Sequence, residues 1–344
     1  MSEPQQVEII VIGAGPAGLC AAAAARSQGL EPLIIEADSR IGGVWHRVEP
    51  DLRCLSPRQR DLLPDGSFPA GEGLRARADE VLACLLAFQD RQRFALRLNC
   101  RALALETHPA GLLLRTSKGS FASRRIVVAT GVYGKPQVPA LPGRFEGLQQ
   151  HSSEVKAADI NDGEQVTVVG SGNSAVDLVA RLLARDLSVS LAARSGLGKA
   201  LPIATGPAAA VMWWASSLPT RWLPHSLRCS DTVPKVDDDL QRAEASGRLS
   251  VYGEALALEP TGLMTAGARL VAADRIIWAT GFRRDLTWIS GLNLDDRGQP
   301  SHDRGLSTEV QGLAFMGLPC MRNRRSGFLR GFAADARDLI RRLA

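Results

Sequence analysis

The sequence lacks any closely spaced pair of cysteines. Its six cysteines are Cys20, Cys54, Cys84, Cys100, Cys229 and Cys320. None forms a Cys-x-x-Cys motif or stands at metal-ligand spacing, so the pattern predicts reduced thiols and no metal site. It also excludes the redox cysteine pair, close in sequence, on which disulfide reductases with two dinucleotide domains depend.

Long hydrophobic runs are also missing. No stretch supplies the roughly 18 apolar residues that a membrane-spanning helix requires. The best candidate, residues 201–219, is interrupted by Gly206 and Pro207. The amino-terminal residues lead directly into an apolar run without a basic-then-apolar signal segment, so we expect a cytoplasmic protein without a transmembrane segment.

Charge of one sign is only slightly in excess, with a net charge of +5 that is spread along the chain. No aromatic-rich nucleic-acid-binding module accompanies it, which argues against a nucleic-acid partner. One basic cluster stands out, comprising Arg322, Arg324, Arg325 and Arg330. A solvated surface patch and a contact with an anionic ligand or surface both stay open for it.

A dinucleotide-binding fingerprint begins the chain. Residues 7–12 form a run of β-branched side chains, as in a buried parallel strand, and Gly13, Gly15 and Gly18 follow. Such glycines permit a tight turn, close approach of a pyrophosphate, and packing of the helix on the strand. The next apolar run ends at Glu36, which can accept hydrogen bonds from ribose hydroxyls.

A second fingerprint, Gly170-x-Gly172-x-x-Ala175, follows the apolar residues 166–169. After its next predicted strand stands Arg194, followed by Ser195, where the first unit has an acid. A guanidinium group can bind a 2′-phosphate that a carboxylate would repel, so this site should prefer NADPH to NADH. The alternative is an exposed arginine at the end of a strand.

Two near-repeats accompany the two fingerprints, at residues 124–136 and 274–285. Each has an apolar strand, then Ala-Thr-Gly, then an aromatic residue, and each follows a polar, strand-rich stretch. The pattern predicts an α/β protein with two Rossmann-like dinucleotide-binding domains.

The segment after Glu36, with Gly42, Gly43 and Trp45, resembles flavoproteins with two dinucleotide domains, in which it passes along the flavin. An ordinary core position is the alternative for Trp45. The resemblance implies FAD at the first fingerprint and NADPH at the second. It also implies an NADP-binding domain, 152–278, inserted into an FAD-binding domain made of 1–151 and 279–344. The carboxy-terminal helix, starting near Gly331, would point its amino-terminus at the flavin. The predicted cofactor-binding residues are Gly13, Gly15, Pro16, Ala17, Gly18, Glu36, Gly43, Val44, Trp45, Arg58, Thr130, Gly131, Gly170, Ser171, Gly172, Asn173, Ser174, Arg194, Ser195, Thr280, Gly281 and Gly331.

A third motif lies between the fingerprints. Phe145, Gly147 and His151 match the Phe-x-Gly-x-x-x-His pattern of flavin-containing and Baeyer–Villiger monooxygenases, although Val155 replaces the final aromatic residue. Residues 52–69 resemble the plant auxin-synthesis flavin monooxygenases and their bacterial relatives, through Ser56, Pro57, Arg58, Leu63, Pro64, Phe68 and Pro69. We expect His151 to anchor the linker between the two domains.

The resemblance to this family implies a monooxygenase. A C4a-(hydro)peroxyflavin formed from molecular oxygen would oxidise a small-molecule nitrogen or sulfur nucleophile or attack a carbonyl, so no protein acid or base is assigned. An NADPH-dependent reductase or oxidase acting on a quinone or oxygen is the first alternative. A non-catalytic FAD-binding protein is the second. The Trp-rich segment 201–227 is left open between core, lid, membrane-facing helix and homodimer contact.

Overall fold

The computed structural model describes residues 3–194, 196–197, 206–220, 239–296 and 298–344, and the chain divides into two compact units. Unit 1 contains residues 1–134, 204–230 and 283–344, and unit 2 contains residues 135–203 and 231–282. The chain therefore crosses between the units four times, whereas the sequence predicted one insertion with borders at 151/152 and 278/279. Each unit is described by itself.

Unit 1 is built on a sheet of seven strands, whose central members are parallel and fully buried. Their runs of Ile and Val explain the burial, because both faces of such a sheet are covered. Its strands, in spatial order, are β21 (His302–Asp303), β22 (Leu306–Ser307), β23 (Leu313–Phe315), β10 (Ile126–Val128), β2 (Ile9–Ile12), β3 (Pro32–Ile35) and β6 (Ala95–Arg97).

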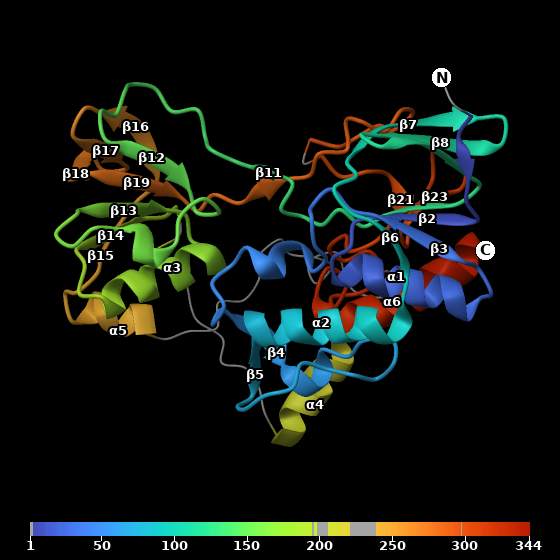
Figure 1. Ribbon diagram of the computed structural model, residues 1–344. Helices are drawn as coiled ribbons and strands as arrows, with labels where there is room; N and C mark the ends of the chain where they lie inside the picture. Colours follow the sequence, from blue (N-terminus) through green and yellow to red (C-terminus); the bar gives the residue numbers. More distant parts are fainter. Residues whose placement is uncertain (1–2, 195, 198–205, 221–238, 297) are drawn as a thin grey trace. The chain divides into compact units, whose positions relative to one another are not determined.

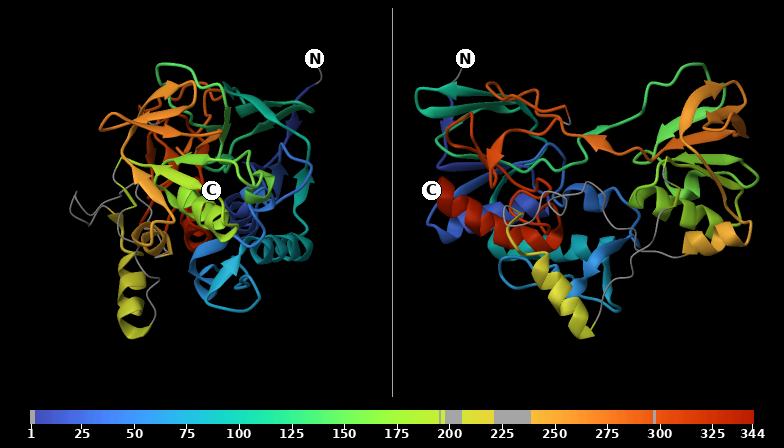
Figure 2. Two further views of the ribbon diagram at one scale, coloured as in Figure 1. Left: turned by 90° about the vertical axis from the view of Figure 1, so that its left-hand side faces the viewer. Right: turned by 180° about the vertical axis from the view of Figure 1, so that it is seen from behind.

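Two smaller sheets complete unit 1. One contains β1 (Gln5–Gln6), β9 (Gly119–Ser123), β8 (Gly111–Thr116) and β7 (Ala102–His108), and the other pairs β4 (Arg53–Pro57) with β5 (Arg75–Arg77). Its α-helices are α1 (Pro16–Ser27), α2 (Ala78–Gln92), α4 (Gly206–Ala215) and α6 (Leu329–Leu343), with short 3₁₀ helices η1 (Gly43–His46) and η2 (Arg58–Arg60). Helix α6 runs beside α1, and α4 extends away from the main sheet (Figure 1; Figure 2).

Unit 2 repeats the plan of unit 1 on a smaller scale. Its parallel sheet contains, in order, β12 (Leu148–His151), β19 (Arg275–Trp278), β13 (Val166–Val169), β14 (Val189–Ala192) and β15 (Ser250–Tyr252). Helix α3 (Asn173–Ala184), helix α5 (Asp239–Ala245) and the 3₁₀ helix η3 (Ala157–Asp159) accompany it. An antiparallel sheet holds β16 (Ala255–Glu259), β17 (Gly262–Thr265) and β18 (Arg269–Ala272).

Two of the chain's crossings lie side by side, because β11 (Lys135–Pro136) pairs with β20 (Phe282–Arg283). The motif around His151, predicted to lie in the linker, belongs to unit 2, where β12 pairs with β19 at the edge of the parallel sheet. Phe145 and Val155 are buried in the cores of that unit. The predicted border was too late because an edge strand was read as a connection.

The cysteines differ from the prediction at one position. Cys20, Cys54, Cys84 and Cys100 are free, but Cys320 is disulfide-bonded, so the prediction of reduced thiols throughout is wrong there. Spacing along the chain does not limit a disulfide, which depends on the distance between the two Cβ atoms in the fold. Cys229 lies outside the described residues. Among the described helices, none is both long and apolar enough to cross a bilayer.

Candidate functional site

The first glycine-rich turn joins β2 to α1, and two of its glycines are required by the chain's own packing. Gly13 has φ +110°, and a Cβ there would lie 2.5 Å from the Ala129 carbonyl oxygen. A Cβ at Gly18 would lie 1.9 Å from the Gly13 carbonyl oxygen. These contacts are the tight turn and the close helix–strand packing that the fingerprint predicts.

Gly15 has no such steric reason among the residues that the structure describes. It is the N-cap of α1 with φ −76°, a value that any residue adopts, and the nearest atom to an added Cβ is Gly43 Cα at 3.8 Å. The two glycines face each other and leave uncovered backbone at the start of a helix, where free N–H groups attract anions. The residues therefore fit a dinucleotide pyrophosphate, and Pro16 and Ala17 form the first turn of the helix below it.

Glu36 follows β3 and lies beside this turn. One carboxylate oxygen accepts a hydrogen bond from the Ala14 N–H at 2.6 Å, and the other accepts one from Asp38 N–H at 2.9 Å. The side chain is buried. Each carboxylate oxygen can accept more than one hydrogen bond, so Glu36 is held in place and still able to bind ribose hydroxyls.

The segment predicted to pass along the flavin is the 3₁₀ helix η1, which contains Gly43, Val44 and Trp45. The Gly42 N–H donates to the Ala14 carbonyl oxygen at 3.0 Å and ties η1 to the first turn. Trp45 is half-buried and packs against the hydrophobic core of unit 1. Trp45 thus fits the alternative of an ordinary core aromatic, and its contact with a flavin stays a prediction.

Arg58, predicted to bind the cofactor, has a structural role in its own loop. Its guanidinium group donates to the carbonyl oxygens of Gly73 at 2.8 Å and Pro69 at 3.0 Å, also contacts the carbonyl of Glu72, and pairs with the Glu80 carboxylate at 3.1 Å. The side chain is buried. Arg58 therefore organises the loop before β5, and its contact with a cofactor stays a prediction.

The second turn, between β13 and α3, copies the first. Gly170 has φ +132°, and a Cβ there would lie 2.3 Å from the Ala279 carbonyl oxygen. Gly172 is the N-cap of α3 with φ −79°, and an added Cβ would meet no atom within 4 Å. Ser171 lies between them, and Asn173 and Ser174 open the helix. Gly172, like Gly15, leaves room for a phosphate group.

Arg194 lies at the end of the strand after α3, as predicted. Its side chain is 82% exposed, with Nε 4.0 Å from Glu254 Oε1, so the guanidinium group can still bind a phosphate. Ser195 lies outside the described residues.

The two Ala-Thr-Gly motifs end β10 and β19, the strands that pair with β2 and β13. Each places an alanine carbonyl against the first glycine of its own turn, as described above for Ala129 and Ala279. Gly131 and Gly281 then adopt φ +80° and +87°. Thr130 is exposed, and Thr280 Oγ1 donates to the Gln137 carbonyl oxygen. Each motif thus adjoins a dinucleotide turn.

His151 is buried at the end of β12 and bound on both sides of its ring. Nδ1 accepts the Ser153 N–H at 3.2 Å, so Nε2 carries the proton and donates to the Gly281 carbonyl oxygen at 3.0 Å. The ring packs edge-on against Phe282, with centroids 4.7 Å apart. Burial lowers the pKa of His151, which keeps the imidazole neutral.

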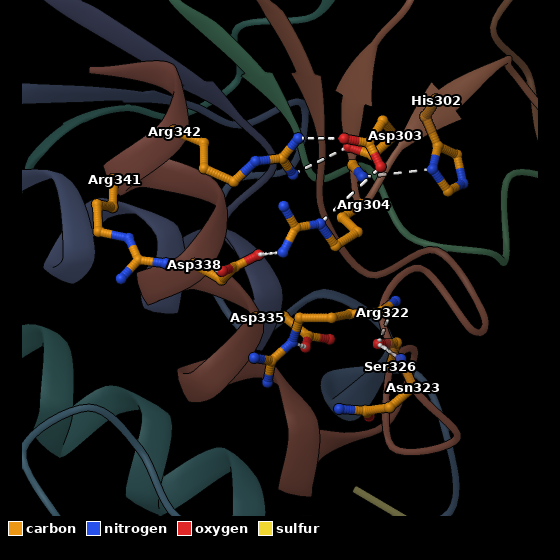
Figure 3. Close-up of polar contacts among 11 residues, drawn as sticks. His302, Asp303, Arg304, Arg322, Asn323, Ser326, Asp335, Asp338, Arg341 and Arg342 are labelled. Atoms are coloured by element: carbon orange, nitrogen blue, oxygen red, sulfur yellow. Dashed lines mark hydrogen bonds and ion pairs between the residues drawn. The ribbon is translucent and has the colours of Figure 1, made fainter. Parts of the chain in front are cut away.

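Helix α6 begins two residues before Gly331, where a Cβ would lie 2.3 Å from the Arg325 carbonyl oxygen. Packing within the chain therefore explains this glycine. The loop before α6 is fixed to the helix by Arg322, whose Nε donates to Asp335 at 2.9 Å, while Ser326 Oγ accepts the Arg322 N–H at 3.1 Å (Figure 3).

One buried group, the carboxylate of Asp61, was not predicted from the sequence. Asp61 has no exposed surface, accepts a hydrogen bond from Ser56 Oγ at 2.6 Å, and has its pKa raised by burial to about 6. The only available signal was an acid between Arg60 and a pair of leucines. A single carboxylate in a loop is usually exposed, so the sequence gave no reason to single it out.

The family model for pyridine nucleotide-disulphide oxidoreductases matches residues 10–201, which include both glycine-rich turns. The chain belongs to this family. An uncharacterized CzcO-like oxidoreductase of Geobacillus kaustophilus is 27% identical, with 97% of each chain covered. The indole-3-pyruvate monooxygenase YUCCA1 of Oryza sativa subsp. japonica is 26% identical, covering 81% of this chain and 78% of its own.

Among solved structures, a flavin-containing monooxygenase from Stenotrophomonas maltophilia superposes with a TM-score of 0.83 at 25% identity, over 98% of each chain. These comparisons confirm the predicted flavin-containing monooxygenase-like family and the two-unit Rossmann-like α/β fold. The protein is an oxidoreductase, as predicted.

Proposed function

We propose that this chain is an NADPH- and FAD-dependent monooxygenase that oxygenates a small molecule at nitrogen, at sulfur or at a carbonyl. The observation that carries the proposal is the pair of helix-capping glycines, Gly15 and Gly172, which no contact with a described residue requires. Two such turns in one chain suit two dinucleotides. The names of the relatives, flavin-containing monooxygenase and indole-3-pyruvate monooxygenase, supply the reaction class.

In this proposal the residues around Gly15, Gly43 and Glu36 hold FAD in unit 1. Gly172 and Arg194 hold NADPH in unit 2, where the guanidinium group donates hydrogen bonds to the 2′-phosphate. When bound, FAD supplies the redox chemistry between NADPH and oxygen. The protein contributes binding and orientation: Glu36 and Arg194 distinguish the two nucleotides by charge, and neutral His151 holds the Gly281 turn through a single hydrogen bond.

The test is an oxygen balance on the purified protein. It should carry one FAD per chain, and with methyl phenyl sulfide as the substrate it should yield sulfoxide in proportion to NADPH consumed. Hydrogen peroxide should be the minor product. If every NADPH consumed gives peroxide whatever substrate is offered, the protein is an oxidase or reductase and not a monooxygenase.

A reductase is the second candidate, because the matched family includes disulphide oxidoreductases. Three of the free cysteines of unit 1 suit that role poorly, since burial raises the pKa of Cys20 and Cys84 and raises that of Cys54 to about 12, and the disulfide at Cys320 is the group that the reductase candidate would have to use. A buried thiol of raised pKa is a weak nucleophile. The reductase candidate predicts NADPH-dependent reduction of a quinone or disulfide at a rate far above that of sulfoxide formation.

A further inference from the structure

Three guanidinium groups of unit 1 gather around one tryptophan. The Arg60 and Arg330 groups lie over the ring of Trp213, 5.4 and 5.2 Å from its centroid, and Arg330 also lies 4.2 Å from the ring centroid of Phe328. Arg325 donates to the Trp213 carbonyl oxygen at 2.8 Å. These residues come from η2, from α4 and from the start of α6 with its preceding loop, so the cluster is assembled by the fold.

Arg330 has buried hydrogen-bond donors that nothing in the described part of the protein accepts. Its Nε and Nη1 atoms are both buried and without a hydrogen-bond partner. Arginine N–H groups are obligatory donors and cannot be deprotonated in a protein, so each such group needs an acceptor. An acceptor from outside the chain would meet this need.

The charge of the cluster also favours an anionic ligand. Two buried carboxylates interact with the three guanidinium groups: Asp61 acts on Arg330 but forms no ion pair with it among the described contacts, and Asp335 acts on Arg325 and is itself paired with Arg322. Burial, Arg325 and Arg60 together lower the pKa of Arg330 to about 10. The half-buried guanidinium groups outnumber the carboxylates, and such an excess of positive charge attracts an anion.

Helix α6, whose second residue is Arg330, packs against helix α1, which begins at the first dinucleotide turn. Gly317 separates Ala17, in the first turn of α1, from Phe332, two residues after Arg330: a Cβ added at Gly317 would lie 3.3 Å from the Ala17 Cβ and 3.7 Å from the Phe332 ring. Arg330 is thus on the helix that packs beside the turn proposed to hold FAD.

We propose that Arg330, together with Arg60 and Arg325, binds the carboxylate of a small organic acid that is the substrate. This inference rests on the proposed function, because it places the acid beside the proposed FAD turn. Trp213 and Phe328 supply aromatic surfaces, which suit an acid with an apolar or aryl body. An inorganic phosphate would gain the charge contact and none of the apolar contact.

The test measures binding separately from turnover. Isothermal titration of the FAD-loaded full chain with phenylacetate should give a dissociation constant at least about tenfold lower than that for phenylacetamide, its neutral analogue, or inorganic phosphate. Arg330→Met should weaken phenylacetate binding about 10- to 100-fold, as expected for loss of a charged hydrogen bond, and leave phenylacetamide unchanged. Arg324→Met, an exposed arginine of the same loop, should change neither.

Arg330→Met should fold, because it removes a buried charge whose donors lack partners. If it does not fold, Arg60→Met provides the same comparison at a second arginine that lies over the Trp213 ring. Any of three results would overturn the carboxylate site. These are an affinity for phenylacetamide equal to that for phenylacetate, an affinity for phosphate equal to that for phenylacetate, and an unchanged affinity for phenylacetate in the variants. Arg330-dependent binding without oxygenation of any sulfide, amine or ketone would leave the site standing and contradict the proposed function. Sulfide oxygenation without Arg330-dependent binding would support the proposed function and overturn the carboxylate site.

Discussion

The imidazole of His151 donates from Nε2 to the carbonyl oxygen of Gly281, 130 positions further along the chain, at 3.0 Å. This bond joins the end of an edge strand to the second Ala-Thr-Gly turn, one residue before the chain leaves unit 2. His151 therefore fixes the backbone that adjoins the proposed NADPH turn, although it is not itself in the glycine-rich loop.

Replacement of His151 by alanine should loosen that turn. We expect the free energy of unfolding to fall by about 0.5–1.5 kcal/mol, the net contribution of one hydrogen bond, because the Gly281 carbonyl oxygen keeps its bond from the Gln137 N–H. With FAD and NADPH bound, less sulfoxide and more peroxide should form per NADPH consumed, because the turn no longer holds its position. Denaturant unfolding and the product balance measure the two effects.

The matched controls for this change are His151→Gln and His108→Ala. Glutamine retains an N–H donor and should restore part of both effects. His108 lies in β7 of unit 1 and accepts only a local hydrogen bond from Ala110 N–H, so its loss should leave the product balance unaltered. An unchanged balance in His151→Ala would show that the bond serves stability alone.

Gly15→Ala and Gly172→Ala should fold normally and lose one nucleotide each. Both glycines have ordinary φ values and open space for a Cβ, so the chain tolerates the methyl group while a pyrophosphate does not. Gly15→Ala should lower the FAD content measured by absorbance, and Gly172→Ala should raise the KM for NADPH with FAD retained. Gly13→Ala is the contrasting control, because it should destabilise the fold itself through the Ala129 contact.

Arg194→Ala should raise the KM for NADPH about 10- to 100-fold and leave the use of NADH nearly unchanged. One charge-assisted hydrogen bond contributes about 1.5–3 kcal/mol, which gives this range. Steady-state kinetics with both coenzymes measures it, and Arg269→Ala, an exposed arginine of the same unit, provides the control. Equal preference for NADH and NADPH in the unmodified protein would contradict the role of Arg194.

The stability of unit 1 should depend on pH through Asp61. Burial raises its pKa from 3.8 to about 6, against the opposing effects of Ser56 and Arg330. The folded protein then holds the proton more tightly than the unfolded chain, so this group's contribution to stability falls as pH rises from about 4 to about 6. Asp61→Asn cannot ionise and should be more stable than the parent at pH 7.5, by up to about 3 kcal/mol, and similar to it at pH 4.

Urea unfolding at the two pH values tests this difference, with Asp186→Asn as the control because that carboxylate is 91% exposed. A stability difference that is the same at both pH values would indicate that Asp61 acts only through its hydrogen bond with Ser56.

The sequence predicted the parts of the fold that local chemistry determines. Gly13, Gly18 and Gly170 are glycines for steric reasons that a fingerprint records, and Glu36 lies where its position after an apolar strand indicates. The contacts of Ala129 and Ala279 with these turns join residues more than 100 positions apart, so the repeated Ala-Thr-Gly pattern signalled a role without its geometry.

Other features depended on tertiary packing. Nothing in the sequence shows that the Arg58 guanidinium group donates to the carbonyl oxygens of its own loop. A buried arginine and a ligand-binding arginine cannot be distinguished from the sequence alone. The position of α4 was equally hidden, because Arg325 and Asn323, which bond to its backbone and to Ser217, lie about 110 residues further along the chain.

Because the chain crosses between the units four times, unit 2 cannot be exchanged between relatives as one continuous segment. A fragment spanning residues 135–282 carries α4 with it, yet in the intact protein that helix belongs to unit 1. Trp213, buried at present, would lose its arginine neighbours in such a fragment, and apolar surface would meet water. Coenzyme modules from relatives therefore cannot be grafted by two cuts alone: a working chimaera has to keep residues 204–230 from the parent that provides the first unit.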